Sequence, residues 1–436
     1  KAPQGLANYI IKANGQKKGI AIAYDSRFMS PEFADEAALC MAANGIKAYV
    51  FESLRPTPEL SFALRTLGCI SGIVITASHN PPEYNGYKVY WEDGAQITAP
   101  KDKEIIAEVK NVTDYHTVKT MDKQEAINAG LYQVIGKEID DAYMVELKKQ
   151  IIHPDVIKEV ADDIKIVYTP LCGTGNKPVR RILSELGFKN VYVVPEQENP
   201  DPKFTTLDYP NPEDPKAFTY ALKLAKEKNA DIVLATDPDA DRLGVYALDT
   251  ASGEYKSFTG NMSGMLIAEY ILRERTATGT MPENPALVTT IVTTNMTAPI
   301  TEAYGVKRIE VLTGFKYIGE QIKLFEQTGS NNYVFGLEES YGCLAGTHAR
   351  DKDAVAATML LCEVAAWCKK HGKTLYDMML EIYEKYGYYK ETQYAITLKG
   401  IDGSKQIAAI MDKLRSNPPK KFGELDVVRV RDYEKD

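Results

Sequence analysis

The sequence predicts an α/β protein: three similar domains, each built on a mixed or parallel sheet, surround a central crevice, and the start of a truncated fourth α+β domain follows. One observation is a pattern that occurs three times, in which an apolar strand and a helix lead to a second apolar strand ending in a polar loop. The other is length, because at about 150 residues per domain the 436 residues suggest roughly three domains. The expected domains are 1–153, 154–257, 258–385 and 386–436.

The first repeat has a strand at 19–24, a helix at 33–43 and a second strand at 73–75, and it ends in the loop 76–80. Ligands of such sheets lie beyond the carboxyl ends of the strands, so this loop is expected to face the crevice. Ser78 would stand there on a turn stiffened by two following prolines. An exposed hydroxyl can act as a nucleophile when a base or a nearby charge activates it. An ordinary polar turn is the alternative, since its residue types are common in turns.

The second repeat has strands at 164–168 and 231–235, with helices expected at 178–186 and 215–227 between them. The loop after its second strand reads Asp-Pro-Asp-Ala-Asp over 237–241. Alternating aspartates on a loop can turn three carboxylates the same way, which makes a site of hard oxygen ligands suited to Mg²⁺. Unpaired carboxylates so close together repel one another, and a cation relieves that repulsion.

An EF-hand and a solvated acidic turn are two other interpretations of this loop. An EF-hand does not fit, because Arg242 stands at its sixth position, where glycine is required, and Leu248 at its twelfth, where glutamate is expected. A solvated acidic turn is the alternative that stays open. Arg242 suits a phosphate bound next to the metal, or a local ion pair with the aspartates.

The third repeat follows a helix expected at 262–275 and has strands at 287–292 and 333–335. Its loop carries two glutamates and a serine between glycines, and Glu338 and Ser340 are the candidates for ligand contacts. Carboxylates hold sugar hydroxyls through charge-assisted hydrogen bonds. A strand-to-turn junction with surface glutamates is the alternative. If the repeats share one crevice, the polar loops of all three face one another.

Composition disfavours several classes of partner. Lys and Arg number 52 and Asp and Glu 60, giving a formal net charge of −8, so nucleic acid and anionic membrane surfaces are not expected as partners. No stretch is long and apolar enough for a membrane span. Six dispersed cysteines without a CxxC pair favour a reducing cytosol, and five dispersed histidines predict no zinc cluster. Neither a Walker motif nor a complete dinucleotide fingerprint is present, so no nucleotide is expected.

Three motifs taken together resemble those of the α-D-phosphohexomutase superfamily, the phosphoglucomutases and phosphomannomutases, in its bacterial phosphoglucomutase-like branch. They are Thr-Ala-Ser-His-Asn-Pro at 76–81, Asp-Pro-Asp-Ala-Asp-Arg at 237–242 and Glu-Glu-Ser at 338–340. Their order and spacing fit from about residue 7 to the end of the sequence. Each motif alone is weakly specific, whereas three in order on three repeats are highly specific.

The resemblance implies an isomerase, an intramolecular phosphotransferase that interconverts glucose 1-phosphate and glucose 6-phosphate. Ser78 would carry a phosphoryl group, which together with Asp237, Asp239 and Asp241 would hold Mg²⁺. Glucose 1,6-bisphosphate would be the intermediate and activator. Phosphomannomutase and phosphopentomutase are alternatives, and a non-catalytic sugar-phosphate-binding protein is an alternative of another class. Gly342 weakly favours glucose, because dual-specificity members often have histidine there.

The resemblance also implies roles for single residues. Lys88 and Arg242 would act near the phosphoserine, with Lys88 as a candidate for proton transfer. The substrate would be held by His79, Thr313, Gly314, Lys316, Glu338, Ser340 and Lys352. The protein is expected to be cytoplasmic, a monomer or weak homodimer, and to act on small-molecule sugar phosphates.

The end of the sequence is expected to begin the fourth domain, with a helix at 405–415 and a valine-rich strand at 427–430. By the resemblance, a Gly-Arg-Gly-type segment would precede Lys1, and the phosphate-binding loop of the fourth domain would follow Asp436. The activity is therefore expected of the intact protein.

Overall fold

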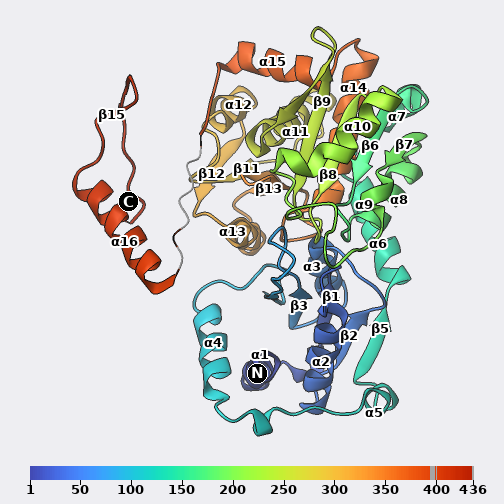
Figure 1. Ribbon diagram of the computed structural model, residues 1–436, viewed down its shortest axis with the longest axis vertical. Coiled ribbons are helices and arrows are strands. Elements are labelled where there is room, and N and C mark those ends of the chain that lie inside the picture. The colour runs from blue at the N-terminus through green and yellow to red at the C-terminus, as the bar shows by residue number, and fades with distance from the viewer. Residues whose placement is uncertain (393–397, 399, 435–436) are drawn as a thin grey trace. The chain divides into compact units, whose positions relative to one another are not determined.

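The computed structural model describes residues 1–392, 398 and 400–434, and the chain divides into two compact units, Lys1–Tyr389 and Lys390–Asp436. The first unit contains three sheets, which Figure 1 shows with helices packed around them. This confirms the prediction of three α/β domains with mixed sheets.

The first sheet has the order β4-β3-β1-β2-β5, with every pair parallel except β3 and β4. All residues of β1 and β3 are buried, which explains why both strands are apolar runs without alternation. The strands are β1 (Ile20–Tyr24), β2 (Ala48–Phe51), β3 (Ser71–Ile75), β4 (Tyr87–Trp91) and β5 (Tyr132–Ile135). The helices are α1 (Ala2–Lys12), α2 (Ser30–Ala43), α3 (Thr57–Thr66), α4 (Lys101–Asn111), α5 (Lys123–Asn128) and α6 (Lys137–Lys148), with 3₁₀ turns at Gln16–Lys18 and Tyr115–Thr117.

The second sheet has the order β10-β9-β8-β6-β7, in which β6 runs parallel to β7 and β8 while β9 runs antiparallel to β8 and β10. Its strands are β6 (Lys165–Thr169), β7 (Asn190–Val193), β8 (Ile232–Thr236), β9 (Leu243–Asp249) and β10 (Glu254–Phe258). Its helices are α7 (Pro154–Val160), α8 (Asn176–Leu186), α9 (Pro195–Glu198) and α10 (Thr219–Lys228), with a 3₁₀ turn at Pro215–Phe218.

The third sheet has the order β12-β11-β13-β14, with β14 antiparallel to β13 and the other pairs parallel. Its strands are β11 (Pro285–Thr290), β12 (Lys307–Val311), β13 (Asn332–Glu338) and β14 (Gly342–Ala345). Its helices are α11 (Gly260–Thr278), α12 (Thr297–Ala303), α13 (Phe315–Thr328), α14 (Ala354–Lys370) and α15 (Leu375–Tyr386).

The three sheets share one arrangement of strands around the polar loop. In each, the strand that carries a polar loop (β3, β8 or β13) has a parallel neighbour on one side and, on the other, the antiparallel strand that its loop leads into. One hydrophobic cluster includes Val74 of β3, Leu234 of β8 and Leu337 of β13. A continuous core therefore fixes the three loop-bearing strands relative to one another.

Helix α14 lies within this core, with all but a few of its residues buried. Its amino terminus is capped by Asp353, whose carboxylate accepts a hydrogen bond from the backbone N–H of Ala356 at 2.8 Å. The same carboxylate accepts hydrogen bonds from the side chains of Tyr143 on α6 and His348, at 2.7 and 2.8 Å. Polar contacts thus reinforce the apolar packing between α6 and α14.

Helix boundaries differ from the predictions where caps and turns intervene. The helix expected at 215–227 is a 3₁₀ turn capped by Asp214 and then α10, which begins at Thr219. The helix expected at 262–275 begins earlier, because the side chain of Thr259 accepts a hydrogen bond from the N–H of Met262. Capping residues are visible in a sequence, but many serines, threonines and aspartates cap nothing.

The second unit consists, over its described residues, of α16 (Gly400–Ser416) and a hairpin of β15 (Lys421–Phe422) and β16 (Leu425–Asp426). The strand predicted at 427–430 is wrong. The hairpin turns at Gly423, whose φ is +58°, and its ladder pairs residues 421–422 with 425–426, so the valines continue beyond the paired part. Residues 393–397, 399 and 435–436 lie outside the described part of the expected fourth domain.

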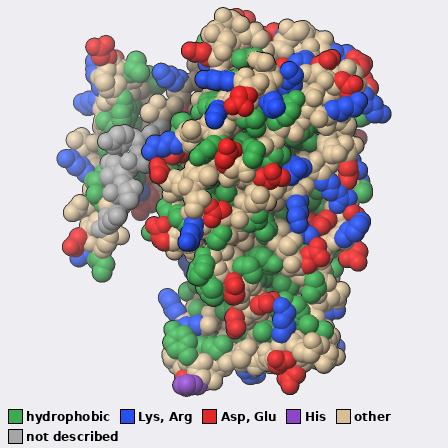
Figure 2. All heavy atoms as spheres, turned by 45° about the vertical axis from the view of Figure 1, so that its right-hand side comes forward, with side chains coloured by type: hydrophobic (Ala, Val, Ile, Leu, Met, Phe, Trp, Pro, Cys, Tyr) green, Lys and Arg blue, Asp and Glu red, His purple; other side chains and the backbone are tan. Residues whose placement is uncertain are grey.

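Among the described residues, none of the helices has the length and apolar character needed to cross a membrane. On the face of the molecule shown in Figure 2, basic and acidic side chains are interspersed among apolar ones.

Candidate functional site

Ser78 stands on a strained turn directly after β3. Its φ is +52°, a left-handed conformation that is uncommon for a residue with a Cβ. Its backbone N–H donates to Oγ1 of Thr76 at 2.8 Å, an ST-type contact that stabilises the turn. A residue at Gly86 with a Cβ would bring that atom to 2.4 Å from the carbonyl oxygen of Thr76, so glycine is required where the chain returns into β4.

Arg27 holds this turn from inside the protein. Its side chain is completely buried, and its guanidinium donates hydrogen bonds to the carbonyl oxygens of Ser78, Asn80, Pro81 and Tyr84. The planar guanidinium carries five N–H donors in a fixed fork and can serve all four acceptors, whereas a lysine ammonium has only three donors. The conformation of the serine turn therefore depends on this arginine, which was not among the predicted site residues.

Asp25 in turn positions Arg27. Its carboxylate lies 3.3 Å from Nε of Arg27 and accepts hydrogen bonds from the side chains of Ser30 and Thr76 at 2.9 and 2.6 Å. Burial raises the pKa of Asp25 to about 6, although the hydrogen bond from Thr76 and the charge of Arg27 act in the opposite direction. Asp25 and Arg27 follow β1 as Ser78 follows β3, and this repeated position was the signal that could have found them.

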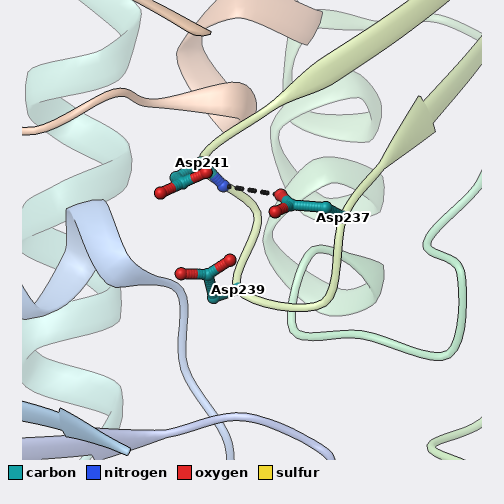
Figure 3. A group of neighbouring side chains, drawn as sticks. All are labelled: Asp237, Asp239 and Asp241. Carbon is teal, nitrogen blue, oxygen red and sulfur yellow. Dashed lines mark hydrogen bonds between the residues drawn. The ribbon is translucent and has the colours of Figure 1, made fainter. Parts of the chain in front are cut away.

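Asp237, Asp239 and Asp241 lie on the loop between β8 and β9, and each is at most 1% exposed. One carboxylate oxygen from each lies within 4.8 Å of the others, and Figure 3 shows the three side chains around a common space. The N–H of Asp241 donates to Oδ1 of Asp237 at 3.1 Å, and Ala240 adopts a φ of +50°. This tight loop turns the alternate side chains to one side.

The carboxylates of this loop fit a divalent cation. Oδ1 of Asp239 and Oδ1 of Asp241 are buried and have no hydrogen-bond partner among the described residues. Burial, followed by the charges of Asp239 and Asp241, raises the pKa of Asp237 well above its usual range. Buried, unsatisfied oxygens of this type are the ligands that Mg²⁺ prefers. The acidic-turn alternative does not fit, because the turn is not solvated.

The structure brings the serine turn and the acidic loop into direct contact. The hydroxyl of Ser78 donates to Oδ2 of Asp237 at 2.8 Å, and its oxygen lies 3.2 Å from Nδ1 of His79. Burial, with the nearby charge of Arg242, lowers the pKa of His79 to about 4, so its imidazole is neutral at pH 7.

Two lysines approach the acidic loop from different domains. Nζ of Lys88, on β4, lies 2.8 Å from Asp239 and 3.5 Å from Asp241. Nζ of Lys352 lies 3.1 Å from both Asp241 and Asp351. Burial alone would lower the pKa of Lys88, but the two aspartates raise it above its usual value, so the ammonium form is stable.

Thr57, at the start of α3, is a further contact of the acidic loop that was not predicted. Its hydroxyl donates to Oδ2 of Asp239 at 2.8 Å, and its N–H donates to the carbonyl oxygen of Asp239 at 2.9 Å. No neighbouring strand or recognisable motif in the sequence indicates this threonine. Its contact is with Asp239, which lies 182 positions further along the chain.

The third loop contributes a buried carboxylate. Oε1 of Glu338, at the end of β13, accepts a hydrogen bond from the N–H of Gly314 at 3.0 Å, and burial raises the pKa of Glu338. Thr313 is exposed, while Gly314, Lys316 and Ser340 are half-buried. A Cβ at Gly342 would lie 2.1 Å from Cδ of Lys352, so this glycine leaves space for the lysine.

Arg242 pairs with a glutamate. Its Nη1 lies 2.7 Å from Oε1 of Glu213, whereas its Nε is 3.8 Å from Asp241. The local ion pair with an aspartate that the sequence suggested is thus the weaker of its two contacts. Its guanidinium is half-buried at the edge of the acidic loop.

Sequence models of known families match most of this chain. Those described as phosphoglucomutase/phosphomannomutase, alpha/beta/alpha domains I, II and III, match residues 1–116, 141–250 and 259–386. A phosphoglucomutase of Staphylococcus aureus is 36% identical over 433 residues, which cover 99% of this chain and 76% of that protein.

Solved structures share the fold. A putative phosphomannomutase from Thermus thermophilus superposes with a TM-score of 0.73 at 24% identity, covering 88% of this chain and 79% of that one. The open form of the Paramecium phosphoglucomutase parafusin gives a TM-score of 0.70 at 19% identity, covering 95% of this chain and 75% of that one.

Proposed function

The chain belongs to the phosphoglucomutase/phosphomannomutase family and is a phosphohexomutase, an isomerase, and from this premise we propose that it interconverts glucose 1-phosphate and glucose 6-phosphate. Ser78 carries the transferred phosphoryl group in this proposal, and glucose 1,6-bisphosphate is the intermediate. The observation that carries the proposal is the contact between the hydroxyl of Ser78 and Asp237, 2.8 Å apart at the edge of three buried carboxylates.

The reaction balances as two transfers. A sugar hydroxyl attacks the phosphorus of phosphoserine, the new P–O bond forms as the bond to Oγ of Ser78 breaks, and the proton lost by the sugar hydroxyl is replaced on Oγ, which leaves as the neutral serine hydroxyl. The bisphosphate turns over, Oγ of Ser78 attacks its other phosphoryl group and gives up its proton, the released sugar oxygen takes up a proton, and the isomeric monophosphate leaves. Phosphoryl transfer depends mainly on positioning and on stabilisation of charge.

The residues of the acidic loop would hold Mg²⁺ through Asp237, Asp239 and Asp241. The ion would neutralise charge that develops on the transferred phosphoryl oxygens. Arg27 fixes the turn so that Oγ of Ser78 stays beside the acidic loop, which keeps the reacting oxygen in place before substrate arrives.

The remaining side chains have positions that suit the substrate. Nζ of Lys88 is a charged proton donor on the serine side of the loop, which supports its role in proton transfer. The carboxylate of Glu338 would accept hydrogen bonds from sugar hydroxyls, and the hydroxyl of Ser340 would donate hydrogen bonds to them or accept from them. Lys352 would meet the substrate from the third domain. His79, neutral at pH 7, can contact substrate without adding charge.

Glucose is favoured over mannose by two observations. The relative from Staphylococcus aureus named above is a phosphoglucomutase. A histidine at Gly342, the residue common in dual-specificity members, would displace Lys352, because a Cβ there already lies 2.1 Å from the lysine side chain. The loop of this chain therefore accommodates the side chain of Lys352 because position 342 is a glycine.

The test uses the full protein with Mg²⁺ and glucose 1,6-bisphosphate, and compares turnover of glucose, mannose and ribose 1-phosphates. Ser78→Ala is expected to abolish turnover, whereas Ser184→Ala, an exposed serine on α8, keeps it. Intact mass after incubation with the bisphosphate should show one added phosphoryl group that Ser78→Ala lacks. Turnover of only mannose or ribose 1-phosphate would overturn the substrate, and turnover that persists in Ser78→Ala would overturn the phosphoserine.

A further inference from the structure

A cavity of about 280 Å³ lies between the first and second domains, apart from the site described above. One wall is formed by the chain leading into α3 and by α6, and the other by the loop before α8 and its first turns. Among the residues that line it are Arg55, Glu59, Asp140, Thr174, Lys177 and Arg181. None of the residues assigned above to phosphoryl transfer or sugar binding lines it.

Two buried polar atoms of this cavity have no hydrogen-bond partner among the described residues: Oε1 of Glu59 and Oγ1 of Thr174. Glu59 is 1% exposed and Thr174 is 2% exposed. Nε of Arg55 lies 4.0 Å from Oε1 of Glu59, beyond hydrogen-bond distance. A buried polar group without a hydrogen-bond partner is unfavourable, so two such atoms lining one cavity indicate that their partners come from a molecule bound there.

One cation of this cavity is available to a negatively charged group. Lys177 has no ion pair among the described residues, whereas Arg55 pairs with Asp140, and Arg181 pairs with Asp141 and Glu185. The eleven-residue helix α8 begins beside it, with Gly175 as an N-cap that supplies no side-chain hydrogen bond. Burial, followed by the hydrogen bond to Asp140, raises the pKa of Glu59 well above its usual range. An anion beside Lys177 would meet a cation and the positive end of the helix dipole.

We propose that this cavity is a regulatory binding site for a small hydroxylated anion, a polyol that carries one phosphate or carboxylate group. Its hydroxyls would donate to Oε1 of Glu59 and exchange hydrogen bonds with Oγ1 of Thr174, while its anionic group would lie against Lys177 and the first turn of α8. The volume suits a molecule smaller than a drug-sized ligand.

Both walls of the cavity contact the acidic loop, so a ligand bound in the cavity would affect this loop. Next to the orphaned hydroxyl, the N–H of Thr174 donates to the carbonyl oxygen of Pro238 at 2.8 Å. A Cβ at Gly173 would lie 2.5 Å from Cα of Pro238, so the two loops are in close contact. Across the cavity, Glu59 follows Thr57 on α3, whose hydroxyl contacts Asp239. A ligand that fixes these walls would change the affinity of the loop for its cation, and this regulatory part rests on the proposed metal site.

The test uses the full chain and two matched probes, glycerol 3-phosphate and glycerate, which distinguish a phosphate from a carboxylate. Saturation-transfer NMR and calorimetry measure binding with glucose 1,6-bisphosphate present to fill the proposed active site. At least one probe is expected to bind with a Kd below about 1 mM. Lys177→Met and Thr174→Val should each weaken binding roughly tenfold, and Lys189→Met, an exposed lysine of the same domain, should not.

Three results would overturn the proposal: binding that the bisphosphate displaces, binding unchanged in Lys177→Met, or a Kd well above 1 mM for both probes. Coupling is measured separately, as the Kd of Mn²⁺ with and without the probe, and a shift of about threefold or more is expected. Probe binding that leaves the Kd of Mn²⁺ unchanged would remove the regulatory role. Probe binding is measured directly and not through turnover. The proposed binding site can therefore be refuted while the proposed mutase activity is confirmed, and the reverse.

Discussion

The hydroxyl of Ser78 donates to Oδ2 of Asp237 across 2.8 Å, although 159 positions separate the two residues in the chain. The two residues follow β3 and β8, the corresponding strands of two different sheets. One shared core fixes these strands, so the packing itself holds the hydroxyl of Ser78 beside the carboxylate of Asp237, the two groups to which we assign phosphoryl transfer and cation binding. Such preorganisation lowers the cost of assembling a phosphoryl-transfer site.

Replacement of Asp239 by asparagine tests the acidic loop. The substitution removes one of three carboxylate ligands and the charge that Lys88 faces, so turnover should fall by about a thousandfold or more. Circular dichroism should show an unchanged fold, and Asp208→Asn, an exposed aspartate of the same domain, should keep normal turnover. Near-normal turnover of Asp239→Asn that still requires Mg²⁺ would show that the cation is held elsewhere.

Replacement of Arg27 by methionine tests the support of the serine turn. It leaves four carbonyl oxygens without their donor and Asp25 without its cation in a buried place, so the free energy of unfolding should fall by about 3–5 kcal/mol. Urea denaturation measures this change, with the exposed Arg180→Met as the control. We expect Arg27→Lys to lose turnover, because the lysine ammonium has too few N–H donors to serve all four carbonyl oxygens. Full activity of Arg27→Lys would contradict the positioning role.

The pH dependence of His79 has a defined sign. Its folded pKa of about 4 lies below the ordinary value of 6.5, so between these values the unfolded state binds a proton that the folded state does not. Stability from this group is therefore complete above about pH 6.5 and falls as the pH decreases towards 4, by at most about 1.4 kcal/mol per pH unit.

Two measurements check this expectation on unphosphorylated protein. NMR titration should show the His79 imidazole titrating with a midpoint near pH 4, in a signal identified by its loss in His79→Gln. The free energy of unfolding of His79→Gln should depend less on pH between 4 and 6.5 than that of the wild type, whereas the exposed His116→Gln should follow the wild type. An imidazole that titrates near pH 6.5 would refute the burial argument.

Replacement of Gly342 by alanine tests the space around Lys352. The added Cβ would overlap the lysine side chain and push Nζ away from Asp241 and Asp351, at 3.1 Å from each in the native protein. We expect kcat/KM for glucose 1-phosphate to fall by about tenfold or more, with a smaller loss of stability. Lys352→Met should show a loss of similar or greater size. Unchanged kinetics of Gly342→Ala would mean that Lys352 does not contact the substrate from this position.

The sequence predicted the parts of the site that follow from local sequence patterns. Ser78 and the three aspartates follow buried apolar strands, and in a parallel sheet the carboxyl ends of such strands are where ligands lie. Arg27 and Asp25 follow a predicted strand in the same way, but one arginine in a polar loop carries no sign of the four carbonyl groups that it reaches. The valine-rich segment 427–430 shows the opposite error, since strand propensity produces a strand only where a partner strand is available.

By itself, the sequence determined the repeated strand-and-loop pattern, the α/β class and the residue types at each loop, because hydrophobic periodicity and turn chemistry act over a few neighbouring residues. Only the tertiary structure decided that Thr57 holds Asp239, that Arg242 pairs with Glu213, and that Glu59 and Thr174 meet at one cavity. These relationships join residues tens to nearly two hundred positions apart, or depend on where a long side chain finds its partner. They exist because a close-packed core brings separate surfaces together, and no local pattern encodes which surfaces those are.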